Sequence, residues 1–139
     1  MINAYFSGTC FPVQPGGHLY CAFLIYQQIN GVRQWTEKKS RYYPSYKFSQ
    51  TSIHLAEFLS FQAILKYLIN NNLQREKIKF HGDHFVIGIA FNGKKIEDGA
   101  HKKTAIECMD LLSEQFKEYR GIGVSNKDNP VCIEFPILL

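Results

Sequence analysis

The spacing of apolar residues changes once along the chain, and this change limits the possible fold more than any other feature. In the first third of the sequence, apolar and polar residues alternate or form short apolar runs, as β-strands do. From Leu55 onward, apolar residues return every three or four positions, which is the repeat of an amphipathic helix. A chain that begins with strands and continues with helices predicts a sheet with helices packed on it.

The amino-terminal part predicts three consecutive antiparallel strands. Residues 2–7 alternate between apolar and other side chains, as in a strand with two different faces. His18–Gln27 is rich in aromatic and branched residues, which is typical of a central strand covered on both faces. Asn30-Gly31 favours a type I′ hairpin turn, because both positions of that turn need positive φ. Val32–Ser40 is then the returning strand.

One long helix and one short strand should follow. The apolar face of the helix consists of five residues spaced three or four apart: Leu55, Phe58, Phe61, Leu65 and Leu68. Thr51 or Ser52 can cap the start of this helix, and residues 70–72 end it. Lys77–His81 is expected as a strand, and Asp83–Phe91 as a short helix.

The carboxy-terminal part predicts a further helix and a last strand. Thr104 and Glu107 have the spacing of a capping box and would open the helix. Its apolar face is Ala105, Cys108, Met109, Leu112 and Phe116. Val131–Ile137 alternates clearly and is predicted as the last strand, in preference to Gly121–Val124. Residues 125–130 would then be a loop, and no further amphipathic helix is expected.

The composition fits a single domain over residues 1–139. We expect a cytoplasmic protein with reduced thiols, because no apolar run is long enough to span a membrane, no secretion signal is recognised and the four cysteines lack Cys-x-x-Cys spacing. The net charge of +4 is compatible with an anionic partner without requiring one. Basic residues form only small clusters, at Lys38-Lys39-Arg41, Lys94-Lys95 and Lys102-Lys103.

Three segments resemble motifs of the type 1 ribonuclease H family, in the order that the family has them. The family's first strand usually ends in Asp-Gly-Ser-Cys, followed by Pro-Gly-Gly; residues 7–10 read Ser-Gly-Thr-Cys and residues 15–17 read Pro-Gly-Gly. Residues 52–58, Ser-Ile-His-Leu-Ala-Glu-Phe, are similar to the family's helix motif Thr-Asn-Asn-x-Ala-Glu-Tyr. Residues 82–84, Gly-Asp-His, resemble Gly-Asp-Ser at the end of the family's fourth strand, and the resemblance covers about residues 2–118.

The resemblance implies a ribonuclease H-like fold of the α/β class. That fold is a mixed five-stranded sheet, made of a three-strand antiparallel meander followed by helix–strand units, with helices packed on it. The family's C-terminal helix is expected to be missing, because Val131–Ile137 favours a strand. The resemblance also implies a nuclease that cuts the RNA strand of RNA–DNA hybrids, with two Mg²⁺ held by four acidic residues.

Two of those four acids are present. Glu57 and Asp83 stand at the second and third positions, and Ser7 replaces the acid that bridges the two ions. A neutral hydroxyl is a poor substitute for a bridging carboxylate. The alternative interpretation is that Glu57 is an ordinary helix residue and Asp83 an ordinary N-cap.

The fourth acid has no clear counterpart. The family pattern Glu-Asn-x-x-Ala-Asp aligns with residues 128–133, which puts Ile133 where the acid belongs; Asp128 and Glu134 are the nearby acids that could replace it. Two carboxylates leave most of the charge of two divalent ions unmatched. A Mg²⁺ or Mn²⁺ pair is therefore not expected, and a single ion at Glu57 and Asp83 would bind weakly.

The resemblance implies nucleic-acid contacts as well. Backbone groups after the first strand, and two asparagines before the helix Glu, bind 2′-hydroxyls in the family; Ile53 and His54 occupy the asparagine positions. Trp35 and the pair Tyr42-Tyr43 could stack on bases or pack on the sheet. The candidate contact residues are Gly8, Thr9, Cys10, His54, Lys94 and Lys95.

Three functions follow as hypotheses. The first is a catalytically degenerate ribonuclease H-like module that binds an RNA–DNA hybrid, duplex RNA or a protein partner. The second is an active metal-dependent ribonuclease H with a rearranged acid set. The third is a purely structural subunit. Fold alone does not decide among them, and no membrane association is expected.

Overall fold

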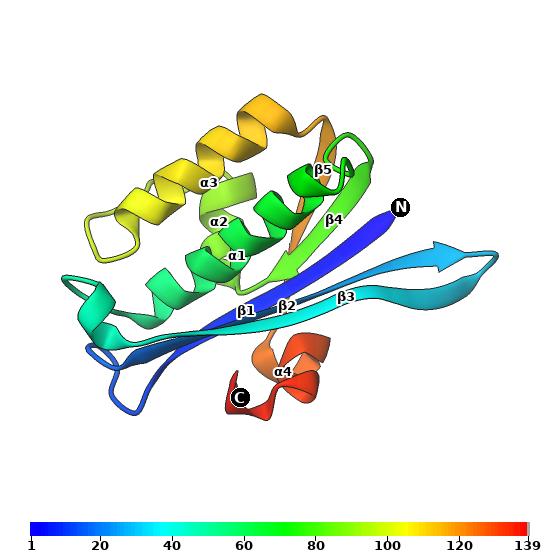
Figure 1. Cartoon of the computed structure of the whole chain (residues 1–139). Coiled ribbons are helices and arrows are strands. Elements are labelled where there is room, and N and C mark those ends of the chain that lie inside the picture. Colours follow the sequence, from blue (N-terminus) through cyan, green and yellow to red (C-terminus); the bar gives the residue numbers. More distant parts are fainter. Residues whose placement is uncertain (139) are drawn as a thin grey trace.

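A mixed five-stranded sheet in the order β3-β2-β1-β4-β5 forms the centre of the molecule (Figure 1). The computed structural model describes residues 1–138, without the side chains at positions 28, 29, 33, 35 and 36. The side chain of Trp35 therefore lies outside the described part. The strands are β1 (Ile2–Phe11), β2 (His18–Ile29), β3 (Val32–Tyr43), β4 (Lys77–Gly82) and β5 (Glu118–Gly123).

The first three strands form the predicted antiparallel meander. β1 pairs with β2 along its whole length, from Ile2 opposite Gln27 to Phe11 opposite His18. The hairpin between β2 and β3 turns at Asn30 and Gly31, whose φ angles of 54° and 77° are the positive values that a type I′ turn requires. The prediction made from the Asn-Gly pair is confirmed.

β4 and β5 extend the sheet in parallel. β4 pairs with β1 only as far as His81 opposite Tyr5, whereas β1 continues to Phe11. The second half of β1, which contains Ser7, therefore runs past the carboxyl end of β4. Such an end of a parallel strand is where polar groups from different elements meet in α/β sheets.

Three helices cover one face of the sheet (Figure 1), namely α1 (Ile53–Asn70), α2 (His84–Phe91) and α3 (Lys102–Gln115). Short 3₁₀ turns occur at η1 (Ser45–Lys47), η2 (Asn126–Asp128) and η3 (Pro136–Leu138). The predicted apolar face of α1 is buried in the core. Ser52, one of the two expected caps, accepts a hydrogen bond from Leu55 N at 3.1 Å. None of the described helices is long and apolar enough to cross a lipid bilayer.

The start of α3 differs from the prediction. The helix begins at Lys102 rather than after Thr104, and no side chain caps it. Its N-cap residue, His101, is buried, and its carbonyl accepts from Ala105 N at 2.9 Å. Thr104 therefore lies inside the first turn of the helix and does not cap it, so the capping-box interpretation of Thr104 and Glu107 is wrong.

The predicted last strand over Val131–Ile137 is also wrong. The last strand is β5, which runs parallel to β4, and the tail forms the short helix α4 (Pro130–Glu134) followed by η3. Val131 and Cys132 are both buried while Ile133 is 68% exposed, which is a helical and not an alternating pattern. Asn129 followed by Pro130 is an N-cap and N1 pair, the local signal that the alternation obscured.

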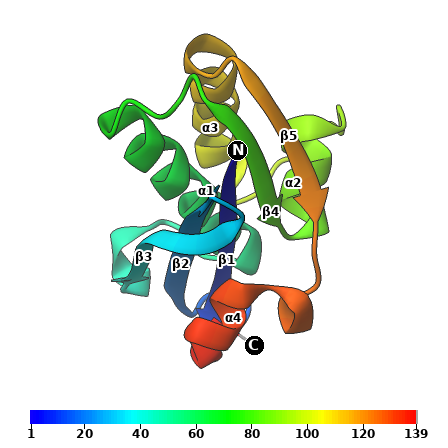
Figure 2. The same cartoon turned by 90° about the vertical axis from the view of Figure 1, so that its right-hand side faces the viewer.

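A C-terminal helix is therefore present, although it is only five residues long. α4 packs on the opposite face of the sheet from the other helices, against Ala22 and Leu24 of β2 (Figure 2). The buried Asn129 holds it there, because its Nδ2 donates to Phe6 O at 3.0 Å while its Oδ1 accepts from Val131 N at 3.1 Å. One side chain thus joins the tail to β1 and caps α4.

Asn129→Ala should lower the free energy of unfolding by about 1–3 kcal/mol, because it removes both hydrogen bonds of a buried amide side chain. Chemical denaturation followed by circular dichroism measures this. Asn126→Ala, at an exposed position of η2, is the control and should change stability by less than about 0.5 kcal/mol. Equal effects of the two substitutions would contradict the anchoring role of Asn129.

Candidate functional site

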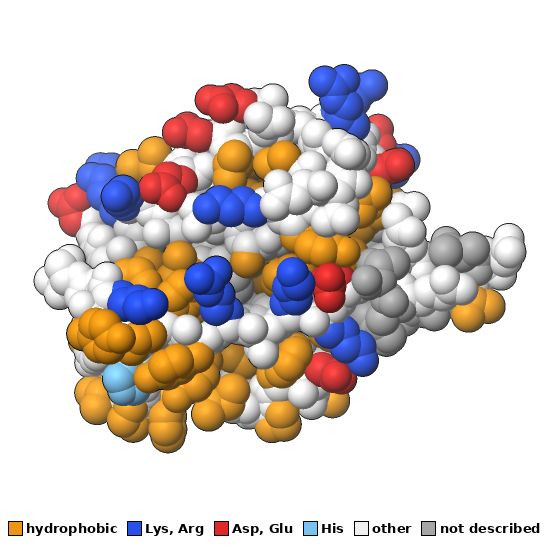
Figure 3. Space-filling view, viewed as in Figure 1, with side chains coloured by type: hydrophobic (Ala, Val, Ile, Leu, Met, Phe, Trp, Pro, Cys, Tyr) orange, Lys and Arg blue, Asp and Glu red, His pale blue; other side chains and the backbone are white. Residues whose placement is uncertain are grey.

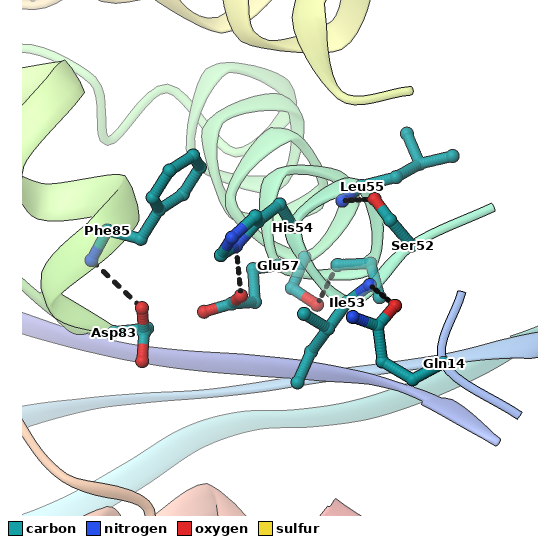
Figure 4. Close-up of polar contacts among 10 residues, drawn as sticks. Gln14, Ser52, Ile53, His54, Leu55, Glu57, Asp83 and Phe85 are labelled. Carbon is teal, nitrogen blue, oxygen red and sulfur yellow. Dashed lines mark hydrogen bonds and ion pairs between the residues drawn. The ribbon is translucent and has the colours of Figure 1, made fainter. Parts of the chain in front are cut away.

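Glu57 and Asp83 come together at the carboxyl end of β4. Glu57 lies in the second turn of α1, and Asp83 follows β4 directly (Figure 4). Asp83 also caps α2, since its Oδ2 accepts from Phe85 N at 2.9 Å. The N-cap interpretation of Asp83 is therefore confirmed, and the same residue stands next to the helix carboxyl group that the family motif pairs it with.

The two carboxyl groups share a site that disfavours two negative charges. Glu57 is only 4% exposed. Burial, and secondly the charge of Asp83, raise the pKa of Glu57 to about 9. At neutral pH Glu57 is therefore protonated.

His54 covers this pair. Its Nδ1 lies 3.1 Å from Glu57 Oε1, and its ring stacks on Phe85 with centroids 3.5 Å apart (Figure 4). Burial lowers the pKa of His54, so its imidazole is neutral at neutral pH. Gln14 Oε1 accepts from Ile53 N at 3.0 Å, which ties the turn after β1 to the first residue of α1.

The buried residue His101 packs beside the stacked rings of His54 and Phe85. It was not identified as a site residue from the sequence. His101 lies edge-on to Phe85, at a centroid distance of 5.2 Å, and stacks on Phe58 at 5.9 Å. Its Nε2 is buried without a hydrogen-bond partner among the described residues. No spacing rule relates His101 to His54, because the loop before α3 brings them together.

Ser7 makes its polar contacts elsewhere. Its side chain is 5% exposed, and its Oγ accepts from Cys132 Sγ of α4 at 3.5 Å. Its carbonyl accepts from Ser60 Oγ of α1 at 2.6 Å. Ser7, which the family motif aligns with the bridging acid, thus packs its hydroxyl group against the C-terminal tail.

Glu134 and Asp128, the two acids considered for the fourth ligand position, form contacts with other residues. Glu134 forms an ion pair with Lys38 of β3 at 3.3 Å, and Asp128 accepts from Ser125 Oγ at 2.9 Å. Ile133, at the aligned position, points into solvent. Within residues 1–138, no group of three or more His, Cys, Asp or Glu side chains is arranged to hold a metal ion. This donor set does not fit a Mg²⁺ pair.

The expected backbone contacts lie in a tightly packed part of β1. Gly8 and Cys10 are buried, and only Thr9 is partly exposed. A Cβ at Gly8 would lie 2.4 Å from the backbone C of Ala56, so only glycine permits this approach of β1 to α1. Lys94 and Lys95 are exposed in the loop after α2. Their contact with nucleic acid remains a prediction.

Comparison with known proteins gives no match among family models and none among curated proteins. Solved structures do match. RNase H1 of the archaeon Halobacterium salinarum is 16% identical, with a TM-score of 0.73 over 93% of this chain and 89% of that one. LC11-RNase H1 in complex with an RNA/DNA hybrid is 13% identical, with a TM-score of 0.74 over 93% and 88%. The N-terminal RNase H domain of rv2228c from Mycobacterium tuberculosis is 14% identical, with a TM-score of 0.73 over 93% and 85%.

The chain has the ribonuclease H-like fold. The α/β architecture expected from the motifs, with a meander followed by parallel strands in a five-stranded sheet, is confirmed. At these identities the likeness establishes the fold and leaves the activity open.

A cleft on this ribonuclease H-like fold is lined by chain neighbours of His54 and His101, among them Leu55 and Ala100, and by neither histidine. It has a volume of about 730 Å³ and runs between the start of α1 and the start of α3. Leu55 and Leu59 line its apolar side, and Lys102 and Lys103 line its basic side. Lys102 also pairs with Asp98 at 2.8 Å. The Lys102-Lys103 cluster, noted in the sequence only as a charge pair, thus lines a cleft between α1 and α3 that also contains Glu107.

Glu57→Gln should change how stability depends on pH. An unfolded Glu has a pKa of about 4.3. Between that value and the folded pKa of about 9, the folded chain keeps a proton that the unfolded chain has lost, so stability falls as pH rises. The Gln variant does not lose stability in this way. Between about pH 5 and about pH 8, its free energy of unfolding should rise by at least about 1 kcal/mol relative to that of wild type.

Denaturation at several pH values measures this effect, and NMR titration of the Glu57 carboxyl carbon measures the pKa directly. Glu114→Gln, at an exposed position of α3, is the matched control and should follow wild type. If the Glu57 carboxyl group titrated near the ordinary pKa of glutamate, the raised pKa of Glu57 would be contradicted.

Proposed function

We propose that this chain is a nucleic-acid-binding module that holds an RNA–DNA hybrid without cutting it. The observation that carries the proposal is the composition of the site at the end of β4. A single pair of carboxyl groups, Glu57 and Asp83, lies there, and the residue that the family motif aligns with the bridging acid, Ser7, has a hydroxyl bonded to Cys132. Lys102 and Lys103 line a separate cleft between the starts of α1 and α3.

The proposed lack of cleavage follows from the small number of carboxylates at the site. Two-metal hydrolysis needs carboxylates that neutralise two divalent ions and hold the attacking and leaving oxygens between them. Glu57 must first lose a proton that burial and Asp83 stabilise, which opposes metal binding at neutral pH. Ser7 contributes no charge, and Glu134 and Asp128 are engaged in other contacts. These features support a module that has lost the ability to hold a magnesium pair.

Binding of a hybrid is supported by the basic side chains and by the fold. Lys102 and Lys103 line the cleft between α1 and α3, and Lys94 and Lys95 are exposed in the loop after α2. Exposed cations of this kind bind phosphates regardless of base sequence. LC11-RNase H1, which shares this fold, was solved with an RNA/DNA hybrid. A hybrid is therefore the first ligand to test, and duplex RNA is its competitor.

A reducing compartment such as the cytoplasm suits the chain. Cys10, Cys21, Cys108 and Cys132 are all buried and none forms a disulfide. Structural disulfides are rare in cytosolic proteins, where thiols are kept reduced.

The test combines binding and cleavage on the same labelled hybrid. Wild type should bind it, as measured by fluorescence anisotropy, with an affinity that falls steeply as salt rises. It should leave the RNA strand intact in Mg²⁺ and in Mn²⁺. The double variant Lys102→Gln/Lys103→Gln should bind about tenfold more weakly, since two phosphate contacts are lost.

Arg75→Gln/Lys117→Gln is the matched control. It removes the same charge from exposed positions just before β4 and β5, at the opposite end of these strands from Asp83. Its affinity should stay within about twofold of wild type. Cleavage by wild type that disappears in Asp83→Asn would overturn the proposal that the chain does not cut the hybrid. Equal binding by both double variants would overturn the proposal that the hybrid binds at Lys102 and Lys103.

A further inference from the structure

A second basic groove lies on the other flank of α1, between this helix and β2–β3. Its volume is about 650 Å³, and we call it the α1–β3 groove. It is lined by Cys21, Ala22, Phe23, Lys39, Ser40, Arg41, Tyr43, Leu59, Ser60, Ala63, Lys66, Tyr67, Asn70 and Asn71. The Glu57 carboxyl group does not line it. The function proposed above makes no use of this groove.

Three cations border the α1–β3 groove. Lys39 and Arg41 are exposed on β3, two residues apart and therefore on the same face of the strand, and Lys66 is exposed on α1. Among the described residues, none of the three forms an ion pair with a carboxylate. Figure 3 shows Lys and Arg side chains gathered along the band between α1 and β3, with apolar surface between them and acidic surface at the right-hand end of the row. The groove is thus charged for an anionic ligand.

Two tyrosine rings hold two of these cations in place. The Arg41 guanidinium lies 4.8 Å from the centroid of Tyr43, and Lys39 Nζ lies 5.7 Å from the centroid of Tyr67. Cation–π contacts at these distances are attractive and restrict the long side chains. The floor below them is apolar, formed by Phe23 and Ala63. The groove therefore combines positioned positive charge at its rim with an apolar bottom.

We propose that the α1–β3 groove binds single-stranded nucleic acid. A single strand presents phosphates at regular intervals along one edge and flat apolar bases along the other, which matches a cationic rim over an apolar floor. Lys39 and Arg41 are about 7 Å apart along β3, a spacing suited to contacts with neighbouring phosphates. The groove has the volume of a small-ligand site, and paired bases of a duplex cannot turn into it.

Leu59 lines both the α1–β3 groove and the cleft between α1 and α3. The two basic surfaces are therefore adjacent on the exposed side of α1. A strand that leaves a hybrid held at the cleft would enter the groove directly. Binding of a free single strand in the groove does not depend on the proposed hybrid binding, and the two are tested separately.

The test measures anisotropy of a labelled oligothymidylate and of a labelled blunt hybrid with the same full-length protein variants. Lys39→Gln/Arg41→Gln should bind the single strand about tenfold more weakly, with a shallower dependence on salt. It should bind the blunt hybrid within about twofold of wild type. Lys102→Gln/Lys103→Gln should show the opposite preference. Circular dichroism verifies that each variant is folded.

Ala63→Glu gives a second route to the same answer. This substitution places a negative charge on the floor of the groove, at a helical position that accepts Glu, and should abolish single-strand binding. Three results would overturn the inference. They are no binding of the oligonucleotide by wild type, unchanged binding by both groove variants, and equal competition by a polyglutamate peptide, which would mark a general polyanion surface. Loss of hybrid binding alone would instead count against the proposed function.

Discussion

The close contact between β1 and α1 at Gly8 is the interaction on which the site depends. A side chain at this position would collide with the backbone of Ala56 and Glu57, so glycine lets the helix lie directly on the strand. Ser60 then reaches the carbonyl of Ser7 at 2.6 Å and fixes the helix along the strand. This contact brings the second turn of α1 level with the end of β4. Glu57 meets Asp83 for that reason, and not because the two attract each other.

The same contact explains why Glu57 keeps its proton at neutral pH. A helix pressed onto a sheet leaves no room for water around Glu57, and Asp83 must point toward it because it caps α2. In a site with enough acids, divalent ions would offset this burial of like charges. Here the remaining ligand positions are a hydroxyl and an exposed hydrocarbon, so the proton takes that role. His54, neutral and stacked on Phe85, then covers the pair.

The sequence predicted those elements whose signals are local. The Asn-Gly turn, the apolar face of α1 and the Asp83 cap depend on residues close together in the chain, and all three are confirmed. The arrangement of the sheet followed from the family motifs. The tail was wrong because alternation over Val131–Ile137 also occurs, by chance, in a short helix and turn whose start Asn129 fixes. That residue bonds to Phe6, more than a hundred positions away, and no local pattern shows such a contact.

The sequence predicted the pair of acids at the site but did not predict the residues around them. Glu57 and Asp83 are quoted by the motifs, whereas His101 and the basic cleft arise only when α3 packs beside α1. The cations of the α1–β3 groove are a stronger case, because Lys39 and Arg41 lie on one strand while Lys66 and Tyr67 come from the helix. In sequence they look like solvated charges on an exposed strand. In the fold, two of them are held over aromatic rings and none forms an ion pair with a carboxylate among the described residues, so the groove presents positioned positive charge to an anion.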